Sequence, residues 1–287
     1  MSRFPHPPPT PLTLSVVMAV YNEVETVATA IERVLAVDIP EVDVELVVVE
    51  SNSTDGTRPV VSRYADDPRM RLVLQDAPQG KGAAVREGFR HATGGIVLIQ
   101  DADLEYSVDD YPRLIEPIMR GDVDFTLGCR HIPGQSVRVM EKARLVAPVM
   151  NTAHWVFTWF FNVTYGTRLR DPFTMYKVFR RECIDGVEFV SDRFDFDWEL
   201  AGKLVRLGYV PVEIPVEYKA RSFHGGKKVR FFRDPPTWIR ACLRFRFCSL
   251  PDQSGAHRPA AAPTVRGPAR RRKGDLVGNR AGDAADG

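Results

Sequence analysis

The sequence lacks three features that would each have assigned it to a familiar class of protein. The chain of 287 residues has no uninterrupted apolar run of about 20 residues, so we predict no membrane-spanning helix. No GxGxxG follows the first apolar run, which argues against a dinucleotide-dependent dehydrogenase. A GKS or GKT tripeptide is also missing, which argues against a P-loop phosphate site.

Cysteine is scarce, and its spacing gives no sign of metal binding. The cysteines are Cys129, Cys183, Cys242 and Cys248, with no CxxC pair and no histidine at metal-ligand spacing. Residues 1–11 are rich in proline and lack the basic-then-apolar pattern of a secretory signal. We therefore expect reduced thiols in a cytoplasmic protein.

Net charge is small, and the excess is unevenly distributed. The formal charge is +2, with 44% hydrophobic and 26% charged residues, which is ordinary for a globular protein. Residues 251–287 contain seven basic residues, four aspartates and almost no large apolar side chains, so we expect a disordered basic tail. Between a proline-rich lead-in (1–11) and this tail, residues 12–250 form one nearly neutral domain, for which we expect no nucleic-acid partner.

Apolar runs and helical periodicity alternate along this domain. Buried strands are predicted over 13–20, 44–49, 71–74 and 96–99, and later over 123–127, 173–179 and 210–218. Helices are predicted over 23–37, 82–91 and 196–207, and another runs from capping residues at 53–56 to about Tyr64. The alternation predicts an α/β fold with a mostly parallel sheet and helices on both faces.

Three polar clusters come directly after three of these strands. They are Tyr21-Asn22-Glu23, Glu50-Ser51-Asn52 and Asp101-Ala102-Asp103. Because ligands of parallel α/β sheets bind outside the carboxyl ends of the strands, we expect the three clusters to lie together along one binding edge of the sheet. Two carboxylates at i and i+2 can turn toward one cation, and oxygen ligands suit Mg²⁺ or Mn²⁺. A solvated turn is the alternative interpretation of Asp101 and Asp103.

Four motifs in the first half resemble, in this order, those of family 2 glycosyltransferases. They are 20–23 (VYNE), 53–57 (STDGT), 80–84 (GKGAA) and 101–105 (DADLE). In the second half, 170–177 (RDPFTMYK), 221–223 (RSF) and 226–228 (GKK) resemble the polyprenyl-phosphate sugar transferases of that family, the group of the dolichol-phosphate mannose synthases. The resemblance covers roughly residues 12–250.

The resemblance implies a GT-A fold and inverting transfer of a hexosyl unit from a nucleotide-diphosphate sugar to a polyprenyl phosphate lipid. It implies that Tyr21, Glu23 and Glu50 line the base and ribose pocket, that Asp101 and Asp103 hold Mg²⁺ or Mn²⁺ with Glu105 as a further ligand, and that Arg130 and Arg221 contact phosphates. Lys81, and Lys227 in a basic loop that suits a lid over phosphates, are further binding candidates. Two departures leave the base and the sugar open: Glu50-Ser51 replaces the usual Asp-Asp pair, and Met175-Tyr176 replaces a common Gly-Phe.

Several of these residues have simpler alternative explanations. Glu23 is also favoured by the dipole in the first turn of a helix. Lys81 between two glycines also fits an exposed loop cation, and Arg221 and Lys227 also fit an ordinary solvated loop.

The acceptor decides which catalytic groups are needed. A phosphate monoester has a second pKa of about 6 and is already a nucleophile at neutral pH, so a polyprenyl phosphate needs no general base. A hydroxyl of a glycan or glycolipid needs one, and Asp195 and Asp197 are the candidates. A nucleotide-sugar-binding module without turnover is a third reading, which the intact Asp101 and Asp103 disfavour.

Contact with a membrane surface is the remaining expectation. Trp238, Ile239, Cys242 and Phe245 are predicted to share a helical face near Arg240, Arg244 and Arg246. Aromatic bulk beside arginine suits an interfacial helix, and core packing is the alternative. We expect a cytoplasmic protein bound peripherally to the inner face of the plasma membrane.

Overall fold

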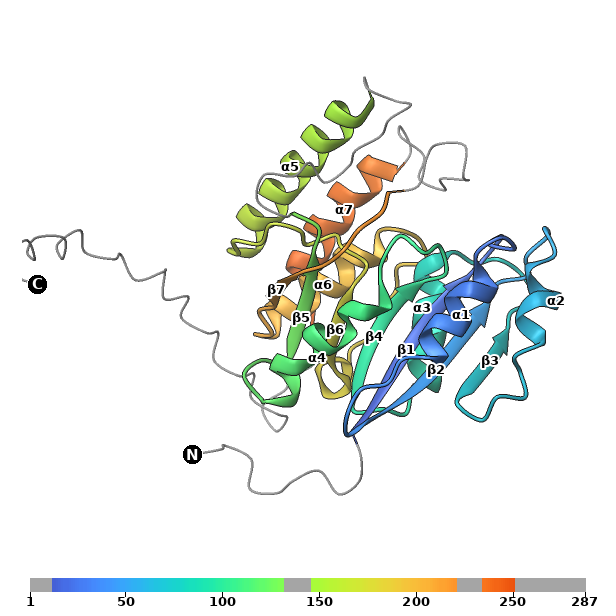
Figure 1. Ribbon diagram of the computed structural model, residues 1–287. Helices are drawn as coiled ribbons and strands as arrows, with labels where there is room; N and C mark the ends of the chain where they lie inside the picture. Colours follow the sequence, from blue (N-terminus) through green and yellow to red (C-terminus); the bar gives the residue numbers. More distant parts are fainter. Residues whose placement is uncertain (1–11, 132–145, 221–233, 251–287) are drawn as a thin grey trace, which may run out of the picture.

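A single sheet organises the chain. The computed structural model describes residues 12–131, 146–220 and 234–250. Within them, seven strands form a sheet in the order β3-β2-β1-β4-β6-β5-β7 (Figure 1). The strands are β1 (Leu12–Val20), β2 (Val42–Glu50), β3 (Met70–Leu74), β4 (Ile96–Asp101), β5 (Phe125–Cys129), β6 (Lys177–Arg180) and β7 (Val212–Pro215). All neighbours pair in parallel except β6, which is antiparallel to β4 and β5, so the predicted mostly parallel sheet is confirmed.

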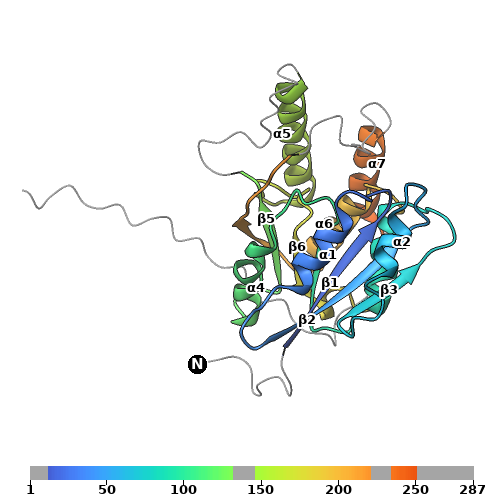
Figure 2. The same ribbon diagram turned by 45° about the vertical axis from the view of Figure 1, so that its right-hand side comes forward.

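Helices cover both faces of the sheet, as predicted (Figures 1 and 2). They are α1 (Val27–Leu35), α2 (Thr57–Ser62), α3 (Lys81–His91), α4 (Tyr111–Met119), α5 (Val146–Tyr165), α6 (Phe196–Arg206) and α7 (Asp234–Phe247). Helices α1, α2 and α4 contribute buried side chains to one hydrophobic cluster, and α3, α5, α6 and α7 contribute to a second.

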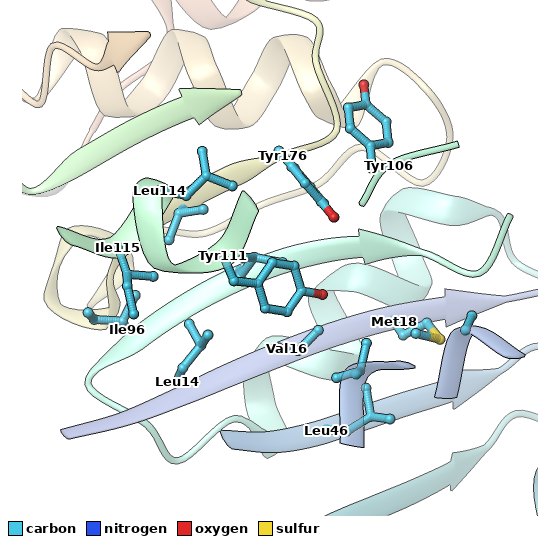
Figure 3. Close-up of a cluster of buried hydrophobic side chains, with 14 of the residues drawn as sticks. Leu14, Val16, Met18, Leu46, Ile96, Tyr106, Tyr111, Leu114, Ile115 and Tyr176 are labelled. Atoms are coloured by element: carbon cyan, nitrogen blue, oxygen red, sulfur yellow. The ribbon is translucent and has the colours of Figure 1, made fainter. Parts of the chain in front are cut away.

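The two clusters follow from the pleat of the strands, whose successive side chains point to opposite faces. On β1, Leu14 and Val16 belong to the first cluster, whereas Val17 belongs to the second. Figure 3 shows the first cluster, in which Tyr111 and Leu114 of α4 lie on the same side of the sheet as Leu14 and Val16. All five side chains are fully buried, so the central strand is covered on both sides.

Several element bounds differ from the predicted ones. Helix α1 begins at Val27 rather than at 23, and residues 24–26 before it form a turn in which the Glu23 carbonyl accepts hydrogen bonds from the N–H groups of Thr26 and Val27. Strand β6 begins at Lys177 rather than at 173, because Met175 N–H donates to Tyr106 Oη instead of to a neighbouring strand. Strand β7 is shorter than the predicted 210–218, and α4 was not predicted.

Helices α5 and α7 pack against each other (Figure 1). The rings of Phe157 and Trp238 lie 5.3 Å apart, and Tyr165 Oη donates to the Cys242 carbonyl at 2.9 Å. The predicted common face on α7 is split: Cys242 and Phe245 are buried in the core, whereas Ile239 is exposed. Among the residues that the structure describes, no helix combines the length and apolar character needed to span a bilayer.

Helix α3 lies directly on β1 at Gly88, and this contact gives a test of the fold. A Cβ at residue 88 would overlap buried Val17, whereas one at residue 95 would meet only Leu12, at 3.5 Å. We predict that Gly88→Ala lowers the free energy of unfolding by about 1–3 kcal/mol. Chemical denaturation followed by circular dichroism measures this change, with Gly95→Ala as the control that should stay within about 0.5 kcal/mol. Alanine has the higher helix propensity, so an unchanged or higher stability of Gly88→Ala would contradict the close packing of α3 on β1.

Candidate active site

The register of the sheet brings three strand ends together. Val20 of β1 lies beside Glu50 of β2, and Ala19 of β1 lies beside Asp101 of β4. The segments that follow β1, β2 and β4 therefore leave the sheet at one edge, as the sequence predicted. This edge is the candidate active site.

Each of these three segments contains a residue with a left-handed backbone. Asn22, Asn52 and Leu104 have φ values of 51°, 55° and 60°. Asparagine tolerates this conformation, but it is costly for leucine. The turn at Leu104 is held by a hydrogen bond from Glu105 N–H to Asp103 Oδ1 at 3.2 Å. Backbone strain of this kind concentrates at functional sites, where the surrounding structure maintains it.

The STDGT motif fixes the turn after β1. Asn22 N–H donates to Ser53 Oγ and Glu23 N–H donates to Thr57 Oγ1, each at 2.9 Å. In return, Thr54 N–H donates to Asn22 Oδ1 at 2.8 Å. We predicted residues 53–56 as helix caps, and Asp55 Oδ1 does accept a hydrogen bond at 3.0 Å from the N–H of Thr57, the first residue of α2. Ser53 and Thr54 instead join two loops of the site.

Glu50 is fully buried beneath this edge and has its own cationic partner. Its carboxylate accepts hydrogen bonds from Asn52 N–H at 3.2 Å and Ser53 N–H at 2.7 Å, and it forms an ion pair with Arg58 Nε. Arg58 Nη2 also donates to the Gln75 carbonyl at 2.5 Å. In this structure Glu50 therefore organises the loop after β2.

Asp101 ends β4, and Lys81 balances its charge. Lys81 Nζ lies 2.6 Å from one carboxylate oxygen of Asp101 and 2.8 Å from the other, and both side chains are 18% exposed. Asp103 is half-buried two residues further on, and Glu105 Oε2 accepts a hydrogen bond from Tyr218 Oη at 2.9 Å. The carboxylate oxygens of Asp101 and Asp103 are of the kind that Mg²⁺ or Mn²⁺ prefers, so their chemistry fits either ion. Among the described residues, however, Asp101, Asp103 and Glu105 do not converge as a group of three ligands.

Lys81 points at the strand end because two glycines let α3 begin against the segment before α6. A Cβ at Gly80 would overlap the carbonyl oxygen of Asp192, and a Cβ at Gly82 would overlap the side chain of Phe196. The GKG motif is therefore a packing device that fixes the backbone on both sides of the lysine. The alternative of an exposed loop cation does not apply to Lys81.

A buried polar cluster supports Asp101 from within the sheet. Gln100 Oε1 accepts hydrogen bonds from Tyr111 Oη at 2.7 Å and Tyr176 Oη at 2.8 Å, while Gln100 Nε2 donates to the Asp101 carbonyl at 2.8 Å. Burial raises the pKa of both tyrosines well above the usual value, so both hydroxyls stay protonated as donors. Sequence reasoning missed this cluster, because Tyr111 and Tyr176 have the spacing of ordinary core residues.

Arg130 pairs with Asp171 beside the end of β5. Its Nε and Nη2 atoms each lie 2.7 Å from a carboxylate oxygen, and the side chains are 7% and 0% exposed. Burial raises the pKa of Asp171, but the charge and hydrogen bonds of Arg130, together with the charge of His154, outweigh burial and lower that pKa to about 2. His131 and His154 lie next to this pair with their Nε2 atoms 2.8 Å apart, and one ligand atom from each histidine and from Asp171 lies within 4.8 Å of the others. Among the described residues, this is a group of three possible metal ligands whose atoms converge. A metal here would have to displace Arg130 from the Asp171 carboxylate, as a metal at Asp101 would have to displace Lys81.

The two carboxylates considered as general bases have different surroundings. Asp197 lies 2.9 Å from Nζ of Lys177, which is fully buried. Burial lowers the pKa of Lys177, an effect that the charge of Asp197 opposes. Asp195 is the N-cap residue of α6, and its Oδ1 accepts a hydrogen bond from Arg193 N–H at 3.2 Å.

The remaining candidates divide between the described and the undescribed parts of the chain. Tyr21 and Glu23 are half-buried on the loop after β1, at the same edge as Asp101. Arg221 and Lys227 lie outside the described residues.

The chain is similar in sequence to several named transferases. The chain is 28% identical over 214 residues to a protein of Haloferax volcanii named glycosyltransferase AglJ, a match that covers 74% of this chain and 65% of the relative. It is 29% identical over 225 residues to an undecaprenyl-phosphate 4-deoxy-4-formamido-L-arabinose transferase of Enterobacter sp., covering 77% of this chain and 63% of the relative. The chain thus spans slightly less than two thirds of the length of these relatives.

The fold is similar to that of glucosyl-3-phosphoglycerate synthase from Mycobacterium tuberculosis, solved in complex with UDP. The TM-score is 0.57 at 22% identity, with 84% of this chain and 82% of the other covered, which supports the GT-A fold. The model of the family described as glycosyl transferase family 2 matches residues 15–185. Because this match spans more than half of the chain and includes the three strand ends with Asp101 and Asp103, the chain belongs to glycosyl transferase family 2.

Proposed function

We propose that the chain transfers a hexosyl unit, with inversion, from a nucleotide-diphosphate sugar to a polyprenyl phosphate lipid. The observation that carries the proposal is the placement of Asp101 and Asp103 at the end of β4, beside the ends of β1 and β2, in a family 2 fold. The name of the relative from Enterobacter, an undecaprenyl-phosphate transferase, supports a lipid phosphate as the acceptor.

The three strand ends would bind the donor. Tyr21 and Glu23 would line the pocket of the base and ribose. Asp101 and Asp103, with Glu105 next to them, would hold Mg²⁺ or Mn²⁺, which when bound neutralises the charge of the departing nucleoside diphosphate. Glu50 would act indirectly, since its buried carboxylate holds the loop between β2 and α2.

The acceptor side would need positive charge rather than a general base. A phosphate is its own nucleophile near neutral pH. Arg221 and Lys227 would steer it toward the donor, and Arg130 would position the chain around Asp171. The ion pair of Asp197 with buried Lys177 supports a phosphate acceptor, because the carboxylate is already engaged by an ammonium group of the chain. Transfer to a hydroxyl remains the second candidate, since Asp195 at the start of α6 has no lysine at ion-pair distance within the described residues.

A lipid acceptor requires access to a membrane surface, and we propose that α5 and α7 provide it at the inner face of the plasma membrane. The exposed large apolar side chains include Trp155, Val156, Trp159 and Val163 on α5 and Ile239, Leu243 and Phe247 on α7. On α5 they recur at i, i+1, i+4 and i+8, which forms one stripe along the helix. Arg240 and Arg244 are exposed next to the α7 residues, and arginine beside aromatic and aliphatic side chains suits an interface with anionic lipid.

The metal role predicts that Asp101→Ala and Asp103→Ala each reduce transfer by roughly 10²-fold or more, because the leaving diphosphate loses its cation. EDTA should abolish the activity of the unmodified protein, and added Mn²⁺ or Mg²⁺ should restore it. The measurement is incorporation of radiolabelled sugar into extracted lipid, with a short polyprenyl phosphate as acceptor. Asp122→Ala, which removes an exposed carboxylate paired with Arg120, is the control. Full activity in EDTA would remove the metal role.

The acceptor reading predicts an order of effects. With a polyprenyl phosphate acceptor, Asp195→Asn and Asp197→Asn should each keep much of the activity. Arg221→Ala should lose about ten- to a hundredfold, because a charge-assisted contact to phosphate contributes roughly 1.5–3 kcal/mol. With a hydroxyl acceptor the order reverses, since loss of a base costs about 10²–10⁴-fold. Circular dichroism must match the unmodified protein before the rates are compared, and a collapse confined to either aspartate variant would exclude the phosphate acceptor.

The membrane reading predicts that Trp155→Ser combined with Trp159→Ser weakens binding to phosphatidylglycerol vesicles at least tenfold, a loss of about 1.4 kcal/mol or more. Co-sedimentation at several salt concentrations measures this affinity. Leu74→Ser on β3 is the matched control, because Leu74 is another exposed large apolar residue, outside α5 and α7. Equal losses in both variants would show that general surface hydrophobicity, rather than α5, binds the vesicles.

A further inference from the structure

Lys81 occupies the position at Asp101 that the proposed function gives to a divalent cation. Its ammonium group contacts both carboxylate oxygens, at 2.6 and 2.8 Å. Only 18% of each side chain is exposed, so solvent screens the pair less than it would a surface ion pair. A metal ion that binds Asp101 must therefore compete with a cation that belongs to the chain itself.

The lysine cannot easily withdraw into solvent. Gly80 and Gly82 fix the backbone on both sides of it by close approach to the segment before α6. Met175 covers the ammonium group, with its sulfur 3.0 Å from Lys81 Nζ. Lys81 consequently stays beside Asp101 unless a stronger anion takes it away.

A second ammonium group lies close enough to act on the same region. Lys177 is fully buried, and its pKa is lowered by burial and further by the nearby charge of Lys81. Asp101 balances one of these positive charges and Asp197 the other. A divalent cation added at Asp101 alone would leave Lys81 without its counter-ion, and the two cations would repel each other. A diphosphate arriving with the metal supplies the missing negative charge, since lysine binds phosphate as a point charge.

We propose that Lys81 acts as a counter-ion of Asp101 and thereby keeps the affinity of Asp101 for a divalent cation low. The affinity rises when a nucleoside diphosphate binds the ammonium group of Lys81 in place of Asp101. The inference rests on the proposed function, because it requires that Asp101 binds the metal. Lys81 is then a positioning residue that couples donor binding to metal binding. Such coupling is reciprocal, so the metal raises the affinity for the diphosphate by the same factor. The site would thus bind the metal and the nucleotide donor together, and would bind the metal only weakly when no donor is present.

The test is the affinity for Mn²⁺ in the absence of any nucleotide, measured from the electron paramagnetic resonance signal of free Mn²⁺. Lys81→Met removes the charge and keeps a side chain of similar length, so it should bind Mn²⁺ roughly tenfold more tightly than the unmodified protein, within the usual range of coupling factors. Lys81→Arg keeps a competing cation and should bind as weakly as the unmodified protein. With UDP or GDP added, and with the Mn²⁺ that the nucleotide binds by itself subtracted by means of a protein-free control, the unmodified protein should gain affinity, and Lys81→Met should gain less.

Two further outcomes separate this inference from the proposed function. Asp101→Asn should lose Mn²⁺ binding in every condition, which identifies the measured signal with this site. One outcome would contradict the counter-ion role alone. In it, the unmodified protein binds Mn²⁺ in the presence of nucleotide, but in the absence of nucleotide Lys81→Met binds Mn²⁺ no more tightly than the unmodified protein. The metal role of Asp101 would then stand. If Mn²⁺ binds under no condition, the metal role falls and this inference falls with it. Thermal midpoints of the variants must lie within a few degrees of each other for the affinities to be compared.

Discussion

The parallel pairing of β1 with β2 and β4 is the constraint on which the candidate site depends. Both faces of β1 are buried, with Val16 packed on one side and Val17 on the other. A slip of one residue would turn each side chain of the strand to the wrong face, so core packing holds the register. The register in turn sets Val20 beside Glu50 and Ala19 beside Asp101. The polar side chains at the edge of the sheet are therefore held in place by hydrophobic contacts deeper in the core.

Four acidic groups at or near this edge are each matched by a basic residue from elsewhere in the chain. The pairs are Glu50 with Arg58, Asp101 with Lys81, Asp171 with Arg130, and Asp197 with Lys177. A carboxylate removed from water is costly unless it is paired and hydrogen-bonded, and three of these pairs contain a fully buried side chain. Within these four pairs the charges are balanced and the polar groups have fixed directions. A charged ligand that bound here would replace one member of such a pair as the partner of the other. The net charge of the pocket would therefore change by less than the charge of the ligand.

Sequence patterns predicted the strands and motifs better than the contacts between them. Valine-rich runs ending at Val20 and Glu50 identify buried strands, and the position of Asp101 after such a run indicates the site edge. Periodicity carries no information about which distant charges meet, so Lys81 with Asp101 could not be derived. Helix α4 was missed because Pro112 and Pro117 interrupt its helical signal, although the structure places one in the first turn and accommodates the other. The direction of β6 depends on its neighbours rather than on its four residues.

The ion pair between Lys81 and Asp101 also bears on how the protein is made. A metal site built only from acidic side chains repels itself when empty, and such a domain can depend on its metal to complete folding. Here the lysine neutralises Asp101 from within, and Gln100 holds the backbone of the same residue. A newly synthesised chain can therefore assemble this edge before any divalent ion reaches it. If the proposed metal role of Asp101 holds, the supply of divalent ions in the cell would set the catalytic rate of the folded molecules and leave their number unchanged.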